Sequence, residues 1–219
     1  MINKKIIILG AGGACMDILS IIDEINQKNI EPRIELLGFL EDKKSKAEKE
    51  IQDKIIGKFK NSKIYKDVKY ITALGNEKNF YFRDKIIEKT NIALKYFTNI
   101  VHPNSLIHKS AKLGLGNVIH AFVNIARNTK IGNHCVILPH STISHDSILG
   151  SHSILSTGVI VSGNTKIGKL CYFGAGTALR DTLKIGNKVL TGVGTVVTKD
   201  IDDEGIYYGV PARFFRKNI

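Results

Sequence analysis

The sequence predicts a chain of two domains: a small α/β domain first, then an all-β domain built from many short parallel strands. Two observations carry this prediction. The first hundred residues alternate apolar runs, glycine turns and amphipathic stretches, which is typical of a parallel sheet covered by helices. From Val101 to Val197 a large apolar residue recurs at nearly every sixth position, a period that no α-helix produces.

The first domain, residues 1–98, is interpreted as Rossmann-like. We expect, in chain order, a strand over 5–9, a helix over 16–25, strands over 34–40 and 70–74, and a helix over about 80–90. Ligands of parallel sheets bind where the strands end. We therefore expect a binding edge at Gly10–Gly13, at Glu41-Asp42 and at Gly75-Asn76, each of which follows a predicted strand.

The turn Gly10-Ala11-Gly12-Gly13 joins a strand to a helix, so its backbone N–H groups are candidates for holding a phosphate at the helix N-terminus. The dinucleotide fingerprint G-x-G-x-x-G is broken, because Cys15 stands where its last glycine would be. A nucleotide diphosphate therefore fits better than a redox dinucleotide, and a plain tight turn is the alternative. Glu41 and Asp42 are candidates for accepting hydrogen bonds from a ribose or a base, or else form a solvated loop.

The second domain, residues 99–206, is predicted to be a left-handed parallel β-helix of hexapeptide repeats. Thr191 is the one residue in the apolar series that is not large and apolar, and a mostly small or β-branched residue stands four places after each member. One side chain per hexad then points inward, and three hexads close one triangular coil. The last segment, 207–219, is expected to leave the β-helix as a cap over its exposed end.

Three hexads per coil place residues eighteen apart next to each other, about 4.8 Å from coil to coil. His134 is therefore expected beside His152, and His145 between Arg127 and Gly163. Two cysteines of the β-helix occupy the small-residue position two coils apart, too far for a disulfide, and are expected to fill the core.

The composition is that of a globular protein, with 43% hydrophobic and 24% charged residues. No apolar run approaches the roughly 18–20 residues of a membrane span. The net charge of +12 raises nucleic acid as a partner, but the lysines are interleaved with acids and lack an accompanying aromatic stripe. Anionic small molecules are favoured over nucleic acid. Three cysteines and no secretion signal predict a reduced, cytoplasmic protein.

Several motifs together resemble those of the bacterial hexapeptide-repeat sugar acetyltransferases, which acetylate sialic acid or UDP-, dTDP- and GDP-linked amino sugars. In the first domain these are Gly10-Ala11-Gly12-Gly13, Gly38-Phe39-Leu40-Glu41-Asp42, and Ala73-Leu74-Gly75-Asn76 with Arg83. Later motifs are Val101-His102-Pro103, His145-Asp146-Ser147-Ile148-Leu149-Gly150, Phe173-Gly174-Ala175-Gly176, the run 192–200 and Gly209-Val210-Pro211-Ala212-Arg213. The resemblance covers essentially the whole chain.

The resemblance implies an acetyl-CoA-dependent transferase that works as a homotrimer, with acetyl-CoA between neighbouring β-helices and no metal. It implies His145 as the catalytic base, with Asp146 orienting its ring. The residues implied for the nucleotide sugar are Gly12, Gly13, Asp42 and Gly75, with Glu41 as a further candidate. Those implied for acetyl-CoA are Gly163 near the thioester, Ala175, Gly192, Val193 and Gly194.

Three positions depart from the family pattern. Ile154 and Leu138 stand where a second histidine and an asparagine are frequent, and Ala14 follows the glycine turn in place of histidine. The contacts of the acceptor and of acetyl-CoA are therefore open, and His152 or His140 is a candidate substitute or a surface residue. The leading prediction is transfer of the acetyl group to a sugar amine, and the second is O-acetylation of a sialic-acid-type hydroxyl.

Two other function classes use the same β-helix. Zinc carbonic anhydrases of the γ class place three histidines at a subunit interface, and His140 and His145 have a suitable spacing, but Asn104 stands where the third ligand is expected. A non-enzymatic scaffold is the remaining class, and the glycines of the implied acetyl-CoA groove and the nucleotide-type first domain argue against it. His145 also has a plain alternative as one of seven outward-facing histidines.

Overall fold

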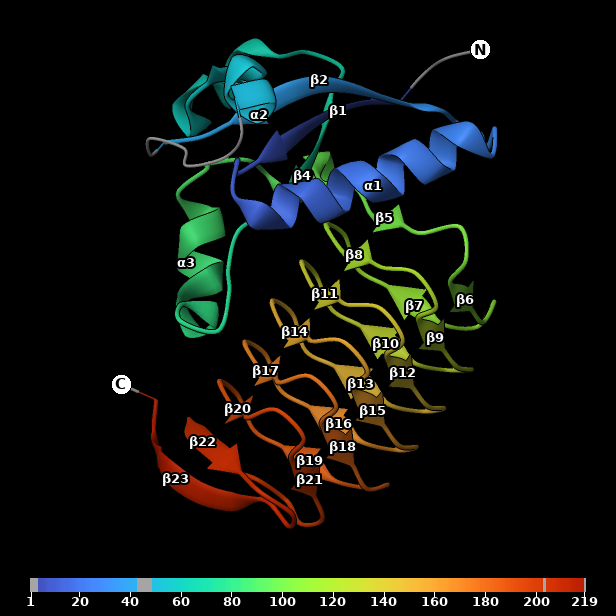
Figure 1. Ribbon diagram of the computed structural model, residues 1–219, viewed down its shortest axis with the longest axis vertical. Coiled ribbons are helices and arrows are strands. Elements are labelled where there is room, and N and C mark those ends of the chain that lie inside the picture. The colour runs from blue at the N-terminus through green and yellow to red at the C-terminus, as the bar shows by residue number, and fades with distance from the viewer. Residues whose placement is uncertain (1–3, 43–48, 203, 219) are drawn as a thin grey trace.

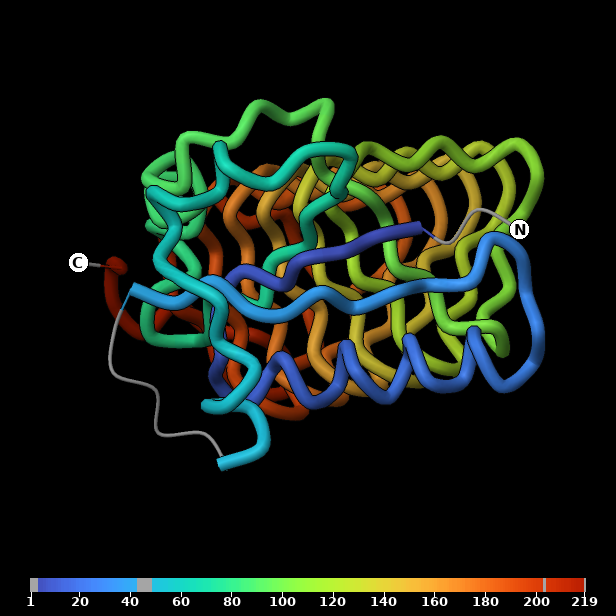
Figure 2. The backbone as a smooth tube through the Cα atoms, turned by 90° about the horizontal axis from the view of Figure 1, so that it is seen from above, coloured from blue at the N-terminus to red at the C-terminus, as the bar shows by residue number. Residues whose placement is uncertain are grey.

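The computed structural model describes residues 4–42, 49–202 and 204–218, and has the two-part architecture that the sequence predicts (Figure 1). The α/β part lies at the top of Figure 1 and the stacked coils lie below it. Seen from above, α1 (Gly13–Gln27) and the first two strands run across the coils (Figure 2). Among the described helices, none has the length and apolar character needed to cross a membrane.

The α/β part contains a parallel sheet of β1 (Lys4–Leu9), β2 (Ile34–Leu40), β3 (Ile55–Gly57) and β4 (Lys69–Thr72), in the order β3-β2-β1-β4. The apolar run of β1 is fully buried from Ile6 onward, as expected for a strand with a neighbour on each side. Because β1 lies between β2 and β4, the loops that follow these three strands meet at one edge of the sheet.

Several elements of this part differ from the predictions. The helix after the glycine turn is longer than expected, and the helix predicted over 80–90 is a 3₁₀ turn, η2 (Phe80–Phe82), followed by the short α3 (Arg83–Glu88). The elements that were not predicted are α2 (Lys49–Asp53), β3, η1 (Phe59–Ile64) and η3 (Leu94–Tyr96). Each of them is too short to show an apolar period, and lysine-rich sequence surrounds them.

The second part is a β-helix of two-residue strands in three parallel sheets. The strands are β5 (Ile100–Val101), β6 (Leu106–Ile107), β7 (Lys112–Leu113), β8 (Val118–Ile119), β9 (Asn124–Ile125), β10 (Lys130–Ile131), β11 (Val136–Ile137), β12 (Thr142–Ile143), β13 (Ile148–Leu149), β14 (Ile154–Leu155), β15 (Ile160–Val161), β16 (Lys166–Ile167), β17 (Tyr172–Phe173), β18 (Ala178–Leu179), β19 (Lys184–Ile185), β20 (Leu190–Thr191) and β21 (Val196–Val197). Every pairing between these strands joins residues eighteen apart, as in Val136 with Ile154. This confirms the predicted stacking.

The core of the β-helix has two kinds of side chain, as predicted. The inward aliphatic residues form one continuous cluster, and Thr191, fully buried, hydrogen-bonds Thr177 across 2.9 Å. Buried serines and threonines of the small-residue position donate to carbonyl oxygens of the next corner, as Ser141 Oγ does to Ser156 O at 2.9 Å. Cys135 and Cys171 occupy the same position, and both side chains are buried.

The chain ends in a hairpin of β22 (Gly205–Tyr208) and β23 (Arg213–Lys217). β22 pairs in parallel with β20, so the terminal segment begins as one more strand of a β-helix face. β23 then pairs antiparallel with β22 and forms the last strand of that sheet.

A stack of two histidines lies where α3 meets the β-helix. The rings of His134 and His152 stack at 5.2 Å, as their spacing predicts, and Phe97 packs edge-on against His134 at 4.5 Å. Burial, aided by nearby positive charge, lowers the pKa of His134 to about 3 and that of His152 to about 4. Arg83 faces both rings, and Asp84, Glu88 and Lys169 also act on His152. Both histidines are therefore neutral at neutral pH.

We expect the free energy of unfolding to fall as the pH is lowered from about 6.5 toward 4. In this range the unfolded chain, whose histidines have ordinary pKa values near 6.5, binds protons that folded His134 and His152 do not. Urea unfolding between about pH 7 and pH 4.5 measures the slope. Replacing both residues by asparagine should flatten it, whereas replacing the exposed His108 should not; an unchanged slope in the double variant contradicts the expectation.

Candidate active site

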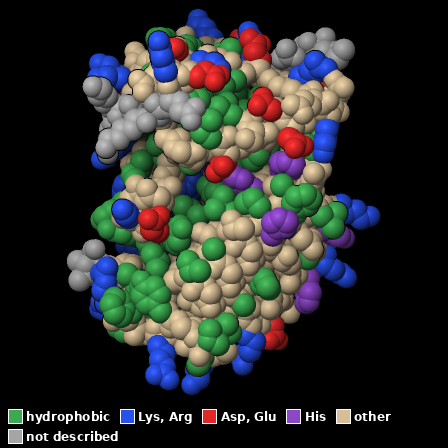
Figure 3. Space-filling model, in the orientation of Figure 1, with side chains coloured by type: hydrophobic (Ala, Val, Ile, Leu, Met, Phe, Trp, Pro, Cys, Tyr) green, Lys and Arg blue, Asp and Glu red, His purple; other side chains and the backbone are tan. Residues whose placement is uncertain are grey.

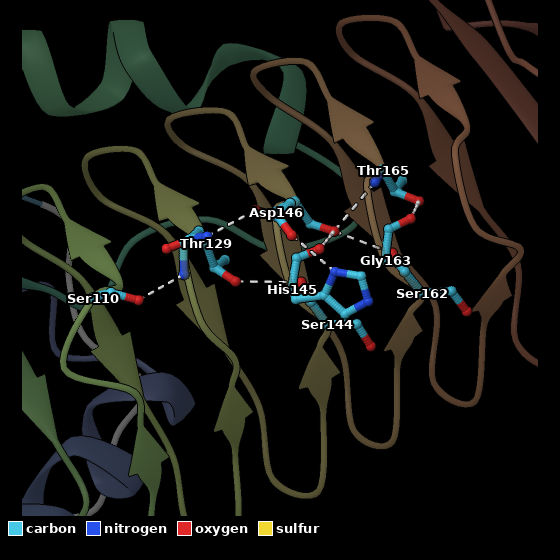
Figure 4. Close-up of polar contacts among 10 residues, drawn as sticks. Ser110, Thr129, Ser144, His145, Asp146, Ser162, Gly163 and Thr165 are labelled. Atoms are coloured by element: carbon cyan, nitrogen blue, oxygen red, sulfur yellow. Dashed lines mark hydrogen bonds and ion pairs between the residues drawn. The ribbon is translucent and has the colours of Figure 1, made fainter.

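His145 and Asp146 lie at the corner between β12 and β13, on the outside of the β-helix (Figure 4). His145 Nδ1 lies 2.9 Å from Asp146 Oδ2. Asp146 has a left-handed backbone, with φ 59°, which lets its carboxylate face the ring of the residue before it. The His145 side chain is 54% exposed, so the far side of the ring is open to a substrate.

Asp146 is held by a second partner from the coil before. Asn128 Nδ2 donates to Asp146 Oδ1 at 2.9 Å. This hydrogen bond and the one from His145 lower the pKa of Asp146, so the carboxylate is ionised at neutral pH. An ionised carboxylate on Nδ1 favours the tautomer with the proton there and leaves the Nε2 lone pair free to take a proton.

Gly163 lies against the His145 ring, one coil further along. A Cβ at this position would come 2.9 Å from both Cε1 and Nε2 of His145, so only a glycine leaves room for the ring. Gly163 O accepts a hydrogen bond from Thr182 N at 2.9 Å, whereas its N–H bonds to no described residue. A free backbone donor thus lies beside the candidate base, as an oxyanion site requires.

A second corner, which joins the eight-stranded sheet to the six-stranded one, carries a ladder of glycines. Gly158, Gly176 and Gly194 have φ of 68–69°, and a Cβ on any of them would meet no atom closer than 4.0 Å. The space beside their Cα atoms is therefore open along three coils, while their N–H groups donate to carbonyl oxygens of the preceding coil. Ala175 and Val193 directly precede two of these glycines, and Val193 is 81% exposed.

Gly192 differs from its neighbours in this predicted acetyl-CoA set. A Cβ there would lie 2.0 Å from Cδ1 of Tyr208. Gly192 is therefore covered by the tyrosine ring of β22, and it allows the close packing of the terminal hairpin.

The two parts of the chain enclose a cavity of about 220 Å³, which we call the junction cavity. Hydrophobic side chains gather between the two parts on the face shown in Figure 3. The start of α1 and the loop after β4, including Gly75, form one side of the cavity. The β-helix side is largely aliphatic, formed by Val118, Val136, Leu138 and Ile154, with His120 and Tyr172 as polar members.

The three positions that depart from the family pattern all line this cavity: Ala14, Leu138 and Ile154. His120 lines it too and was not predicted. Its side chain is 6% exposed, burial lowers its pKa, and no described residue hydrogen-bonds its ring. The six-residue period marks His120 as outward-facing but does not show that another domain covers it.

The remaining predicted residues lie at the carboxyl edge of the α/β sheet. Glu41 Oε2 accepts a hydrogen bond from Ala11 N of the glycine turn at 2.9 Å, and Asp42 Oδ1 accepts one from Phe59 N at 2.9 Å. A carboxylate already satisfies one N–H of the turn, so an anion would use those of Gly12 and Gly13, where a Cβ would meet nothing within 4 Å.

One chain does not bring these groups together. His145 and Gly163 share the corner between the five- and six-stranded sheets, the glycine ladder occupies a second corner, and the junction cavity lies on the eight-stranded sheet. In a triangular coil, the His145 corner is opposite the face that bears the junction cavity. Within residues 4–42, 49–202 and 204–218, no three His, Cys, Asp or Glu side chains are grouped to hold a metal.

Comparisons with known proteins match each part of the chain. Residues 5–90 match the PglD N-terminal domain family, and residues 101–205 match the GMPPB C-terminal domain family. The acetyltransferase domain of PglB from Neisseria gonorrhoeae, solved with acetyl coenzyme A, superposes with a TM-score of 0.84 at 24% identity, covering 97% of this chain and 100% of that one. The chain has the fold of the hexapeptide-repeat sugar acetyltransferases.

Two further structures share this two-part fold. A histidine-to-alanine variant of GDP-perosamine N-acetyltransferase from Caulobacter crescentus, in complex with CoA and GDP-perosamine, has a TM-score of 0.83 at 20% identity and covers 99% of both chains. WeeI from Acinetobacter baumannii has a TM-score of 0.79 at 22% identity, covering 97% of this chain and 100% of that one. A comparison with curated proteins gives no significant match.

We expect Gly163→Ala to push the His145 ring away from its present place. The added methyl group would stand 2.9 Å from the ring, about 0.5 Å inside ordinary contact, and the exposed ring moves more easily than the backbone. A crystal structure of the variant measures the shift, with Ser162→Ala as the neighbouring control. A ring that keeps its place and its 2.9 Å contact with Asp146 would show that Gly163 does not position it.

Proposed function

We propose that the protein is an acetyl-CoA-dependent N-acetyltransferase that acts on the amino group of a UDP-, dTDP- or GDP-linked amino-deoxy sugar in bacterial surface glycan synthesis. The observation that carries this proposal is the His145 ring, which contacts the Asp146 carboxylate on one side and packs against Gly163, whose N–H bonds to no described residue. The structural relatives support it, since two of them were solved with acetyl coenzyme A or with CoA and GDP-perosamine.

The geometry supports a direct transfer. The neutral sugar amine attacks the thioester carbonyl, and Nε2 of His145 takes the amine proton as the carbon–nitrogen bond forms. Asp146 stabilises the imidazolium, and the Gly163 N–H is a donor to the carbonyl oxygen as negative charge develops on it. The carbon–sulfur bond then breaks, His145 returns its proton to the departing sulfur, and the amide and CoA are released.

The glycine ladder is the proposed path of the pantetheine arm. Ala175, Val193 and Gly194 lie along it, with an exposed Val193 side chain and open space beside Gly194, whereas the Tyr208 ring covers Gly192. The net charge of +12 favours the phosphates of CoA and of a nucleotide sugar. We place the reaction in the cytoplasm, in keeping with an odd number of cysteines, all of them buried.

The proposed acceptor site is the carboxyl edge of the α/β sheet together with the junction cavity. Gly12, Gly13, Glu41 and Asp42 would face the nucleotide, and Gly75 would face the sugar. His145 lies on the opposite edge of the same β-helix, so the reacting groups meet only if a second copy supplies one of them. We therefore propose a homotrimer, in which each site uses the His145 corner of one copy and the junction cavity of the next.

The deciding experiment is CoA release from acetyl-CoA with a panel of UDP-, dTDP- and GDP-linked 3-amino and 4-amino sugars. We expect turnover with at least one sugar, and a loss of about a hundredfold or more in kcat for His145→Ala because the base is gone. His108→Ala removes another exposed histidine of the β-helix and should retain activity.

The absence of wild-type turnover with every amino sugar of the panel would contradict the proposed N-acetylation. Sialic-acid-type hydroxyl acceptors are then the next panel, since the His145–Asp146 pair is a base suited to a hydroxyl as well. Turnover that survives His145→Ala would keep the reaction and remove His145 from it.

The shared site predicts complementation between two inactive variants. His145→Ala lacks the base, and Leu138→Trp fills the junction cavity with a bulky ring. If each site takes one part from each of two neighbours, mixed trimers of equal composition should regain about one quarter of the sites. Turnover assays on co-expressed, doubly tagged protein measure this, and no gain over the separate variants would contradict the shared site.

A further inference from the structure

Arg83, the first residue of α3, is the largest fully buried side chain of the described residues. Burial lowers its pKa to about 10, so the guanidinium is still charged at neutral pH. No described carboxylate pairs with it. A buried charge without an ion pair is destabilising unless dipoles compensate for it. Nε and Nη1 have carbonyl partners, and Nη2 has no hydrogen-bond partner among the described residues.

The guanidinium joins the two domains through backbone oxygens. Nε donates to Leu74 O at 2.7 Å, in the loop after β4. Nη1 donates to His134 O, at the β-helix corner between β10 and β11. One planar side chain therefore ties a loop of the α/β domain to a corner of the β-helix.

The loop after β4 also packs closely against the Arg83 side chain. Gly75 has φ +104°, and a Cβ there would come 2.6 Å from Cδ and 2.8 Å from Nε of Arg83. The next residues of the same loop, Asn76 and Glu77, line the junction cavity together with Gly75. The position of this wall is thus set by the arginine beneath it.

The β-helix end of the contact is rigid. His134 is packed between the rings of His152 and Phe97, and burial keeps both histidines neutral, so the guanidinium meets a carbonyl dipole and no second charge. Val136, two residues after His134, belongs to the aliphatic side of the cavity. Arg83 therefore connects one wall of the junction cavity to the other.

We propose that Arg83 is a positioning residue that fixes the 74–77 wall of the junction cavity against the β-helix, so that binding of the nucleotide-sugar acceptor depends on it. The proposal rests on the acceptor site proposed above. A lysine at position 83 cannot take over this role, because a single ammonium lacks the planar set of donors that reaches Leu74 O and His134 O together.

Hydrogen exchange tests the positioning itself and needs no substrate. We expect amides of the segment 73–79 to exchange about tenfold faster in Arg83→Met and Arg83→Lys, while the β-helix peptides after residue 140 keep their protection. Lys85→Met removes an exposed charge from the same helix and is the matched control. Unchanged exchange at 73–79, or equal loss of protection throughout the chain, would overturn the proposal.

Steady-state kinetics test the consequence for the acceptor. With the amino sugar that the wild type uses, Arg83→Lys should raise the acceptor KM by about tenfold and leave the acetyl-CoA KM unchanged. Gly75→Ala keeps the charge but lifts the loop off Arg83, and it should show the same split. Wild-type acceptor KM values in both variants would contradict the proposal. If the wild type uses no amino sugar, the proposed function fails, and the exchange experiment still decides whether Arg83 holds the wall.

Discussion

The stacking of residues eighteen apart is the constraint on which the rest of the structure depends. From residue 116 to residue 194 every sixth residue has a left-handed backbone, as at Asp146 with φ 59°, and each strand position repeats one coil later. The same register that buries the inward aliphatic residues sets Asn128 beside Asp146 and Gly163 beside His145. The candidate catalytic geometry is therefore a by-product of the fold period and needs no special loop.

This dependence explains how much of the site the sequence predicts. The hexad period predicts the β-helix, its stacking and the neighbours of His145, because all of these follow from fixed offsets along the chain. Fixed offsets along the chain do not predict the burial of His120 or the contacts of Arg83. His120 occupies an outward position like many others, and only the folded α/β domain covers it; the partners of Arg83 are carbonyl groups, one of them fifty-one residues away. Short elements such as β3 and α2 are not predicted for another reason, because they contain too few residues to show a period.

The junction between the domains combines polar groups that are costly to bury singly. Arg83 carries a charge with no described carboxylate beside it, and Nδ1 of His134 and of His152 has no hydrogen-bond partner among the described residues. Neutral histidines lower this cost, because a protonated ring next to the guanidinium would add repulsion in a medium of low dielectric. An apolar contact would hold the domains together at less cost, but it would not fix the loop after β4 through directed hydrogen bonds to two carbonyl groups.

The proposed function places chemistry and recognition on different parts of the coil. One corner contains His145, Asp146 and Gly163 at stacked positions. The geometry of the proposed base and oxyanion donor is therefore kept as long as the register of the coils is kept. The junction cavity is assembled from the start of α1, the loop after β4 and one β-helix face, and side chains there change without disturbing the stack. All three departures from the family pattern, Ala14, Leu138 and Ile154, lie in that cavity. Under the proposed function, acceptor specificity is therefore to be sought at the junction, where Leu138 and Ile154 are aliphatic and His120 contributes a polar ring, while the proposed transfer step depends on the His145 corner.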